Sequence, residues 1–577
     1  MKVSKKISYM LIAFLILLNI VFRYPTTSHE LGVDSFFVHG LANSISANGY
    51  AKWAIHPLSI FGVYPFSYPC GVPYILSGVS QCTGLNMEWT IFLVAILIGI
   101  FGMFNAYVMA REVKDDVLFT FLVAFAFSTA PIFLYFTRWT SSPRHLFLAL
   151  LPLLMWTLLR YHNKKDKRCI LLFIVLFMVL SAVHRMIWLM IPILFAYFVA
   201  VIIQKAAERI TISKKSLISI LATLLLGVVV TFIIIFIGNP LFLILLVFIA
   251  YLLNIPLRKL DKNVITPVIV SFILGLLFVY AFIIQFSPIE FYSGIWYDYE
   301  TGYFFEGADL HILVLNMLSN YTGHVGILIV FALIGLIFLL FKAKKDFNDW
   351  FILLSILFLL PILALGTYVS VLILPFLSIL IALGMCKILH IKQIKKYAFP
   401  AVVGCLLISL LFSSFTICHW EERGIQYGDP AKTWIMKDET YSMALFVKEY
   451  GYGAFISDNR RIGYRLSAFS EVPVFPGHSA WPMTYDFIDE VTSVTSSDFT
   501  INMDYVFIAN NTAENDYNQL LVLDCDNNTA KEILSKYNIH YYIENKDMQI
   551  QNKFFNSVRE KRYKMYDDGV GSIWYIQ

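Results

Sequence analysis

Charged residues are scarce in this chain: Asp, Glu, Lys and Arg make up 14% of its 577 residues, against about 25% in soluble domains. Hydrophobic residues reach 58%, which argues against a soluble globular protein and favours a polytopic membrane protein. The formal net charge of +5 is small for this length and says nothing about nucleic acid.

Cysteine spacing gives no sign of a metal or redox site, because the seven Cys form no C-x-x-C pair and no Cys/His ligand pattern. The sequence allows a disulfide between Cys70 and Cys82 or between Cys418 and Cys525. The favoured alternative is that these cysteines are small apolar side chains that fill space in the interior. No small-residue cleavage site follows the first apolar run, which predicts a retained span rather than a signal peptide.

Apolar runs near the roughly 20 residues that a helix needs to cross a bilayer recur about thirteen times. They lie at residues 7–22, 89–110, 117–136, 146–159, 169–183, 186–204, 216–237, 241–256, 264–287, 324–341, 350–365, 371–386 and 397–417. Every loop on one side contains Lys or Arg. The loops on the other side carry only Arg23, Lys52, Arg138, Arg144 and Arg185. This asymmetry predicts a cytoplasmic N-terminus, and an odd number of spans then predicts an external C-terminus.

Two parts follow from this pattern. Residues 1–417 form the predicted transmembrane part, with long external loops at 23–88 and 288–323. Residues 418–577 form a predicted external α/β domain, because the strand-length runs AFIS, YVFIA, LLVLD, HYYIEN and SIWYIQ are interspersed with the helix-like RRIGYRLSAF and TAKEILSKYN.

The first external loop begins with HELGVDSFFVHGLANS, which sets carboxylates and histidines among aromatics. Its apolar residues recur at helical spacing, and they are Val33, Phe36, Phe37, Leu41 and Ile45. With Asp34 suited to the N-cap and Gly49 to the stop, the pattern predicts an amphipathic helix on the outer membrane face. Asp34 is either a cap or a general base for an incoming nucleophile; Glu30 could share a metal with it or raise its pKa.

Basic residues crowd two short external loops. TRWTSSPRH supplies Arg138, Arg144 and His145, and AVHRMIW supplies His184 and Arg185. A planar guanidinium pairs well with phosphate oxygens, whereas a single Arg at a membrane boundary often only snorkels to ordinary headgroups. Clustering on the carboxylate-bearing side favours a lipid-phosphate site.

The second long loop is acidic and aromatic and contains no Lys or Arg. Its Asp298, Glu300 and Glu306, with His56 of the first loop, are candidates for binding a sugar or acceptor; a divalent cation or a solvated cover are the alternatives.

In the C-terminal domain, a strand-to-helix turn is either an anion site or solvated surface. It carries Asp458, Arg460, Arg461 and Arg465.

Together these features resemble the GT-C glycosyltransferases, a membrane superfamily that includes oligosaccharyltransferases and protein O-mannosyltransferases. The resemblance is carried by HELGVDSFF after the first span, the long aromatic first loop, TRWTSSPRH, and the run from ILSKYNIHYYIENKD to YKMYDDGVGSIWYIQ. It implies a sugar donor on polyprenyl (dolichyl) phosphate and a catalytic or acceptor-orienting carboxylate at Asp34, with Glu30 second. The chain has AFISDNRRIGY where oligosaccharyltransferases carry a Trp-Trp-Asp motif, which favours transfer of one sugar from a lipid monophosphate.

The resulting hypothesis is an integral membrane enzyme that transfers a sugar, with inversion, to a glycan or protein acceptor at the external face. Asp34 deprotonates or orients the acceptor, and Arg138, Arg144 and Arg185 stabilise the departing lipid phosphate. Alternatives are glycan transfer to protein Asn, a non-catalytic scaffold, and a lipid or sugar transporter or flippase. The last is disfavoured by spans that are almost free of ionisable residues. The expected partners are a membrane lipid and a lipid-linked sugar, with no nucleic acid. A divalent metal requirement stays open.

Overall fold

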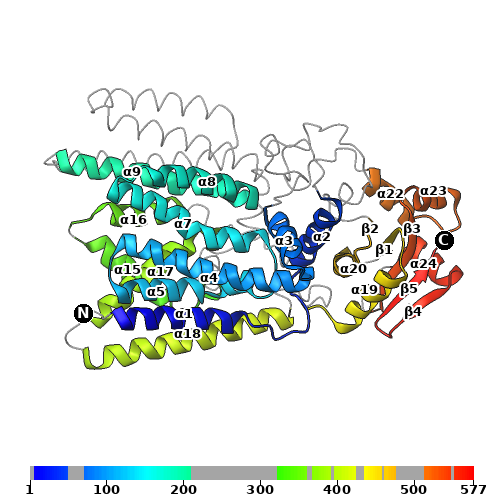
Figure 1. Ribbon diagram of the computed structural model, residues 1–577, viewed down its shortest axis with the longest axis horizontal. Helices are drawn as coiled ribbons and strands as arrows, with labels where there is room; N and C mark the ends of the chain where they lie inside the picture. Colours follow the sequence, from blue (N-terminus) through cyan, green and yellow to red (C-terminus); the bar gives the residue numbers. More distant parts are fainter. Residues whose placement is uncertain are drawn as a thin grey trace, which may run out of the picture.

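The computed structural model describes residues 5–49, 71–209, 321–342, 344–359, 367–390, 395–423, 435–457, 460–475, 512–546 and 551–576. A bundle of long helices occupies one end of the molecule, and a small sheet with its own helices occupies the other (Figure 1).

The bundle consists of apolar helices that run along the long axis of the molecule (Figure 1). They are α1 (Lys5–Arg23), α4 (Met87–Val113), α5 (Val117–Ser128), α6 (Pro131–Thr137), α7 (Pro143–Lys164), α8 (Arg168–Val183), α9 (Ile191–Arg209), α15 (Ile329–Phe341), α16 (Phe347–Leu359), α17 (Thr367–Leu389) and α18 (Lys395–Arg423), with a short 3₁₀ turn η1 (Arg185–Met190). Among the described residues, α1, α4, α17 and α18 are long and apolar enough to cross a membrane, and α5 with α6 makes a fifth candidate. The helical membrane part is thus confirmed; the count of about thirteen is not, and predicted spans 216–237, 241–256 and 264–287 lie outside the described residues.

The prediction of one continuous span at 117–136 is wrong. The helix ends at Ser128 and resumes at Pro131, and the two pieces are bent by 58°. Proline has no N–H to donate and disfavours helical geometry at the residue before it, so Pro131 begins a new helix at its first turn. Helix α6 then leads into the connection that carries Arg138.

Helices α2 (Val33–Asn48) and α3 (Gly71–Thr83) lie at the end of the bundle that faces the sheet (Figure 1). The predicted helix and its stop are confirmed: Gly49 has a φ of 76° and its N–H donates to the carbonyl oxygen of Ile45 at 2.8 Å. The predicted N-cap is wrong, because Gly32 occupies the cap and Asp34 lies in the first turn.

Opposite faces of helix α2 are both buried in the protein. The prediction of an amphipathic helix that lies on the membrane surface with one face exposed is therefore wrong. Ser35 and Ser44 project to opposite sides of the helix and both are buried, as is Phe36 between them in sequence. The side-chain amide of Asn43 donates to the carbonyl oxygen of Ala468 at 2.9 Å, so α2 contacts the C-terminal part directly.

The C-terminal part is a five-stranded mixed sheet with the order β2-β1-β3-β5-β4. Its elements are α19 (Asp438–Tyr450), β1 (Ala454–Ser457), α20 (Arg460–Ser470), β2 (Val474–Phe475), α22 (Thr512–Leu521), α23 (Asn528–Lys536), β3 (Ile539–Asn545), α24 (Lys553–Lys561), β4 (Lys564–Asp567) and β5 (Gly571–Tyr575). Strand β1 runs parallel to β2 and β3, and β5 runs antiparallel to β3 and β4.

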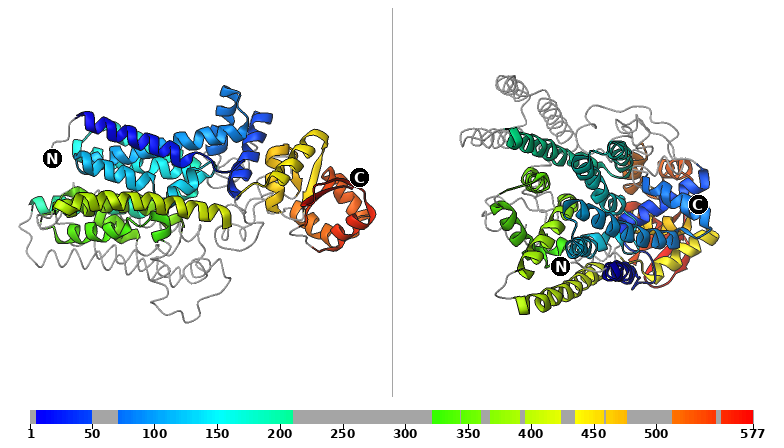
Figure 2. Two further views of the ribbon diagram at one scale, coloured as in Figure 1. Left: turned by 90° about the horizontal axis from the view of Figure 1, so that it is seen from below. Right: turned by 60° about the vertical axis from the view of Figure 1, so that its left-hand side comes forward.

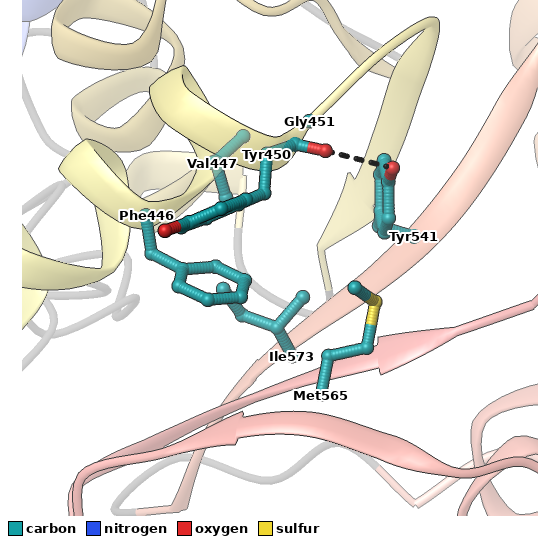
Figure 3. Close-up of a pocket in the computed structure, with 7 residues that line it drawn as sticks. All are labelled: Phe446, Val447, Tyr450, Gly451, Tyr541, Met565 and Ile573. Atoms are coloured by element: carbon teal, nitrogen blue, oxygen red, sulfur yellow. Dashed lines mark hydrogen bonds between the residues drawn. The ribbon is translucent and has the colours of Figure 1, made fainter.

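Alternate residues of the strands enter two separate cores, one on each face of the sheet. Tyr541 and Ile543 of β3 pack with the core that includes α19, whereas Tyr542 packs with the core formed by α22, α23 and α24. Figure 3 shows the first contact, where Phe446 and Tyr450 of α19 lie over the sheet and the hydroxyl of Tyr541 donates to the carbonyl oxygen of Tyr450 at 3.4 Å. Figure 2 shows this layered unit from two further sides.

The sheet bears out most of the α/β pattern. AFIS, HYYIEN and the SIWY of SIWYIQ lie in strands, and RRIGYRLSAF and the TAKEILSK of TAKEILSKYN lie in helices. LLVLD is not a strand: Leu521 ends α22, whose buried Tyr517 and Leu520 are three residues apart on one helical face. YVFIA lies outside the described residues.

Candidate active site

The site is built on two connecting segments that are fastened to each other. Trp139 has a φ of 41°, rare for a residue with a side chain, and its carbonyl oxygen accepts from the N–H of Leu31 at 2.9 Å. The N–H of Ser141 donates to the hydroxyl of Ser35 at 2.8 Å. The entry to α2 is therefore held against the connection between α6 and α7.

The start of α7 fixes the next arginine. Ser142 is the N-cap, and its hydroxyl accepts from the N–H of Arg144, while the N–H of Ser142 donates to Nδ1 of His145 at 3.1 Å. His145 is 1% exposed and serves as a helix cap here. Pro143 occupies the first helical turn, where a missing N–H costs nothing.

Asp34 and Arg144 meet, although 110 residues separate them in the sequence. Nη1 of Arg144 donates to Oδ2 of Asp34 at 2.6 Å. The Asp34 side chain is 45% exposed and that of Arg144 is 23% exposed, so solvent or a ligand can reach the pair. The guanidinium also lies over the ring of Phe136, 5.5 Å from its centroid.

Glu30, the second predicted carboxylate, is fully buried. Its Oε1 lies 2.7 Å from Nδ1 of His39, and its Oε2 accepts from the hydroxyl of Ser35 at 3.4 Å. Burial raises the pKa of Glu30, because a low-dielectric interior disfavours the ionised form. Its partners are side chains of α2 itself, so its structural role is to hold the first turns of that helix.

A further acid, Glu88 at the start of α4, joins this network. Its Oε1 lies 3.1 Å from Nδ1 of His29 and accepts from the backbone N–H of Glu30 at 3.2 Å. The His29 ring is stacked on Tyr441 of α19 at 3.8 Å between centroids, and its Nε2 lies 3.7 Å from Asp438. The entry to α2 is thus tied both to the bundle and to the sheet part.

The remaining basic candidates have other partners. Nη2 of Arg138 donates to the hydroxyl of Thr26 at 2.7 Å, so Arg138 and Arg144 hold different segments. Nδ1 of the buried His184 accepts from the N–H of Met186 at 3.0 Å.

Several candidates lie outside the description. For Arg185, Arg460 and Arg461 only the backbone is described, and five predicted residues are not described at all: His56, Asp298, Glu300, Glu306 and Asp458. Arg465 is 4% exposed with its guanidinium over the Phe36 ring, so it packs against α2 rather than on the solvated surface that was one alternative.

In the described part of the chain, one group of potential metal ligands converges, formed by Asp524, Cys525 and Asp526. It does not fit a cation, because both oxygens of Asp524 accept from Lys561 and Asp526 accepts from Arg562. Cys418 and Cys525 are free thiols, which excludes the disulfide between them, and Cys82 is also free.

No protein-family model matches the chain, and no curated protein sequence matches it. Solved structures do. A crystal structure of the Archaeoglobus fulgidus oligosaccharyltransferase tethered to an acceptor peptide with an NVT sequon superposes with a TM-score of 0.56 at 12% identity, covering 94% of this chain and 69% of that one. The same organism's AglB, in complex with an inhibitory peptide and a dolichol-phosphate, gives 0.55 at 12% identity, over 93% and 69% of the two chains.

A third match is ArnT from Cupriavidus metallidurans bound to undecaprenyl phosphate, with a TM-score of 0.49 and 10% identity over 99% of this chain and 97% of that one. The two oligosaccharyltransferase superpositions show that the chain has a GT-C-like membrane fold, as the resemblance in its sequence implies. Apolar helices in this fold make it an integral membrane protein. At such low identity the likeness concerns the fold and leaves the reaction to be argued from the site.

Proposed function

We propose that the protein is a glycosyltransferase that moves a sugar from a polyprenyl-phosphate carrier to an acceptor, at the membrane face where α2 lies. The observation that carries the proposal is the contact between Asp34 and Arg144. It sets a reachable carboxylate and a guanidinium 2.6 Å apart at the edge of an apolar bundle. With the predicted cytoplasmic N-terminus, this face is external.

The Asp34 carboxylate suits the attacking hydroxyl of such a displacement, and the Arg144 guanidinium suits the departing phosphate. The acceptor hydroxyl attacks the anomeric carbon, its oxygen forms the new glycosidic bond, and its proton passes to the Asp34 carboxylate. The bond between that carbon and the phosphate oxygen breaks, and the lipid leaves as a monophosphate whose negative charge Arg144 stabilises. Attack opposite the leaving group inverts the anomeric centre.

The contact between the two residues also orders the steps. A donor phosphate that arrives at Arg144 competes with Asp34 for the guanidinium, because both are anions that seek the same N–H groups. Binding of the donor therefore turns the carboxylate toward the acceptor. Glu30 and Glu88 act as positioning residues, since they hold the entry of α2 through His39 and His29.

The other sequence candidates complete the proposal. His145, His184 and Arg185 are proposed to act on the phosphate side, and Asp298, Glu300, Glu306 and His56 are proposed to contact the sugar or the acceptor. Residues 1–417 and 418–577 are proposed as a membrane domain and an external domain. The contact of α2 with α20, and that of His29, just before α2, with α19, support a site covered by the second domain.

Deletion of the gene followed by complementation tests this function. Mass spectrometry of surface glycans and glycoproteins should show one sugar missing after deletion and restored by the wild-type gene. D34N should not restore it at equal protein abundance. The control is Asp115→Asn, because Asp115 is 80% exposed and its ion pair is with Arg111.

Restoration by D34N would overturn the role of Asp34 and favour a transporter or scaffold. Loss of an Asn-linked glycan, rather than of one sugar, would favour an oligosaccharyltransferase.

A further inference from the structure

A cavity of ≈ 410 Å³ lies where the ends of α1, α6 and α18 come together, next to the segment that leads into α2. Helices α1 and α18 run along the same side of the bundle (Figure 1), and both contribute to this cavity. Its apolar lining includes Val21, Phe22 and Ile417, and its polar lining includes Thr26, Arg138 and Ser414. Volumes of roughly 300–1,000 Å³ are typical of sites for small molecules.

Charge is distributed unevenly over this lining. Arg138 is 7% exposed and is the one charged side chain among the described residues that line the cavity. Nη2 of Arg138 donates to the hydroxyl of Thr26, and a guanidinium, with five N–H donors in a planar fork, can bind a phosphate oxygen as well. Most of the remaining lining is apolar and comes from α1, α6 and α18. The cavity therefore suits a molecule with an anionic head and an apolar tail.

Access to the cavity is from the lipid side. Val21, on a helix apolar enough to cross the membrane, is 60% exposed, and Tyr24, just beyond the end of that helix, is 67% exposed; both line the cavity. A side chain as apolar as Val21 stays exposed at low cost only where hydrocarbon surrounds it. Tyr24, with a ring and a hydroxyl, is the residue type enriched at the level of the headgroups.

We infer that this cavity binds an anionic glycerophospholipid, with its phosphodiester on Arg138 and Thr26 and an acyl chain against Phe22 and Ile417. The site is separate from the proposed reaction, whose guanidinium is Arg144. It lies against the same two connecting segments, because Thr26 precedes His29 and Arg138 precedes Trp139. A bound lipid would therefore also brace the entry to α2.

Cys418 offers a direct readout, since it is a free thiol that lines the cavity. The full-length protein is placed in nanodiscs of phosphatidylcholine alone or with added phosphatidylglycerol, and the rate of maleimide labelling is read by peptide mass. Phosphatidylglycerol should slow the labelling of Cys418. Cys82, an exposed free thiol outside the cavity, serves as the internal control and should label at one rate throughout.

Variants identify the contact. R138Q should weaken retention of phosphatidylglycerol about tenfold in native mass spectrometry, because a charge-assisted hydrogen bond is lost. Ser414→Trp fills the cavity from α18 and should abolish retention while leaving Arg138 in place, which covers the case that R138Q does not fold. The control is Arg168→Gln, whose side chain is 91% exposed and bound to Asp166.

Three results would overturn the inference. The first is equal protection of Cys418 by both lipids, and the second is retention unchanged in R138Q and in Ser414→Trp. The third is displacement of phosphatidylglycerol by a stoichiometric amount of C55 polyprenyl monophosphate, which would make the cavity a carrier-lipid site instead.

Discussion

Replacement of His39 by Ala should destabilise the protein strongly, because His39 is the closest partner of a fully buried carboxylate. The N–H that it presents to Glu30 at 2.7 Å is a hydrogen bond to a charged acceptor, which contributes about 1.5–3 kcal/mol. Without it, Glu30 retains the longer bond from Ser35, at 3.4 Å. Because a buried carboxylate that loses its closest donor is not compensated by water, we expect a loss of about 2–3 kcal/mol at neutral pH.

This loss should depend on pH in a defined direction. Burial raises the pKa of Glu30 above its ordinary value of 4.5, so Glu30 costs stability as the pH rises from that value through its pKa in the folded protein. His39 opposes the shift, and its removal raises the pKa of Glu30 further. The additional loss of folding stability in His39→Ala therefore reaches its full size above the pKa that Glu30 has in the folded variant. It disappears below about pH 4.5, where Glu30 is protonated in both the folded and unfolded states.

Thermal unfolding in detergent at about pH 8 and about pH 4 checks both points, with tryptophan fluorescence as the signal. Glu30→Gln combined with His39→Ala contains the same cavity without the buried charge, and should recover more than half of the loss at the higher pH. His419→Ala, at an exposed residue stacked on Phe415, is the control. An unchanged unfolding temperature for His39→Ala at about pH 8, or no recovery in the double variant, would refute the reasoning.

Three further predictions follow from the site and the sheet. Asp34→Asn and Arg144→Gln should each lower stability by no more than about 1 kcal/mol, since the pair is partly exposed, and unfolding temperatures will show this. Tyr441→Ala removes a stacked ring at the contact between α19 and the entry of α2, so hydrogen exchange in α19 should accelerate. Alkylation under non-reducing, denaturing conditions should label Cys418 and Cys525 completely; protection of both until a reductant is added would contradict their being free thiols.

Local patterns predicted the elements well where one residue type decides the geometry. The helix at 33–48 and its end at Gly49 follow from apolar spacing and from the φ that glycine tolerates. Averaged hydropathy missed the break at Pro131, because a single proline hardly changes the mean of an apolar run. The run LLVLD misled because four apolar residues in a row fit the end of a helix as well as a strand.

The site was predictable only as a set of candidates. That Asp34 and Arg144 share one side of the membrane follows from the distribution of Lys and Arg, but their contact depends on the backbone of Trp139 and on the bond from Ser141 to Ser35. Glu88 was missed, because it acts on His29 across 59 residues without any local pattern. Contacts of this kind arise from tertiary packing.

The central claim is that Asp34 and Arg144 carry out sugar transfer from a lipid carrier. Its most direct test is the release of free polyprenyl monophosphate from a panel of sugar-linked polyprenyl phosphates by the purified protein in liposomes with cell-envelope acceptor. The wild-type protein should release it from one member of the panel, and D34N should do so about 100-fold more slowly or less, as expected for loss of a general base. Equal release by D34N, or no release from any member by the wild-type protein, would contradict the account.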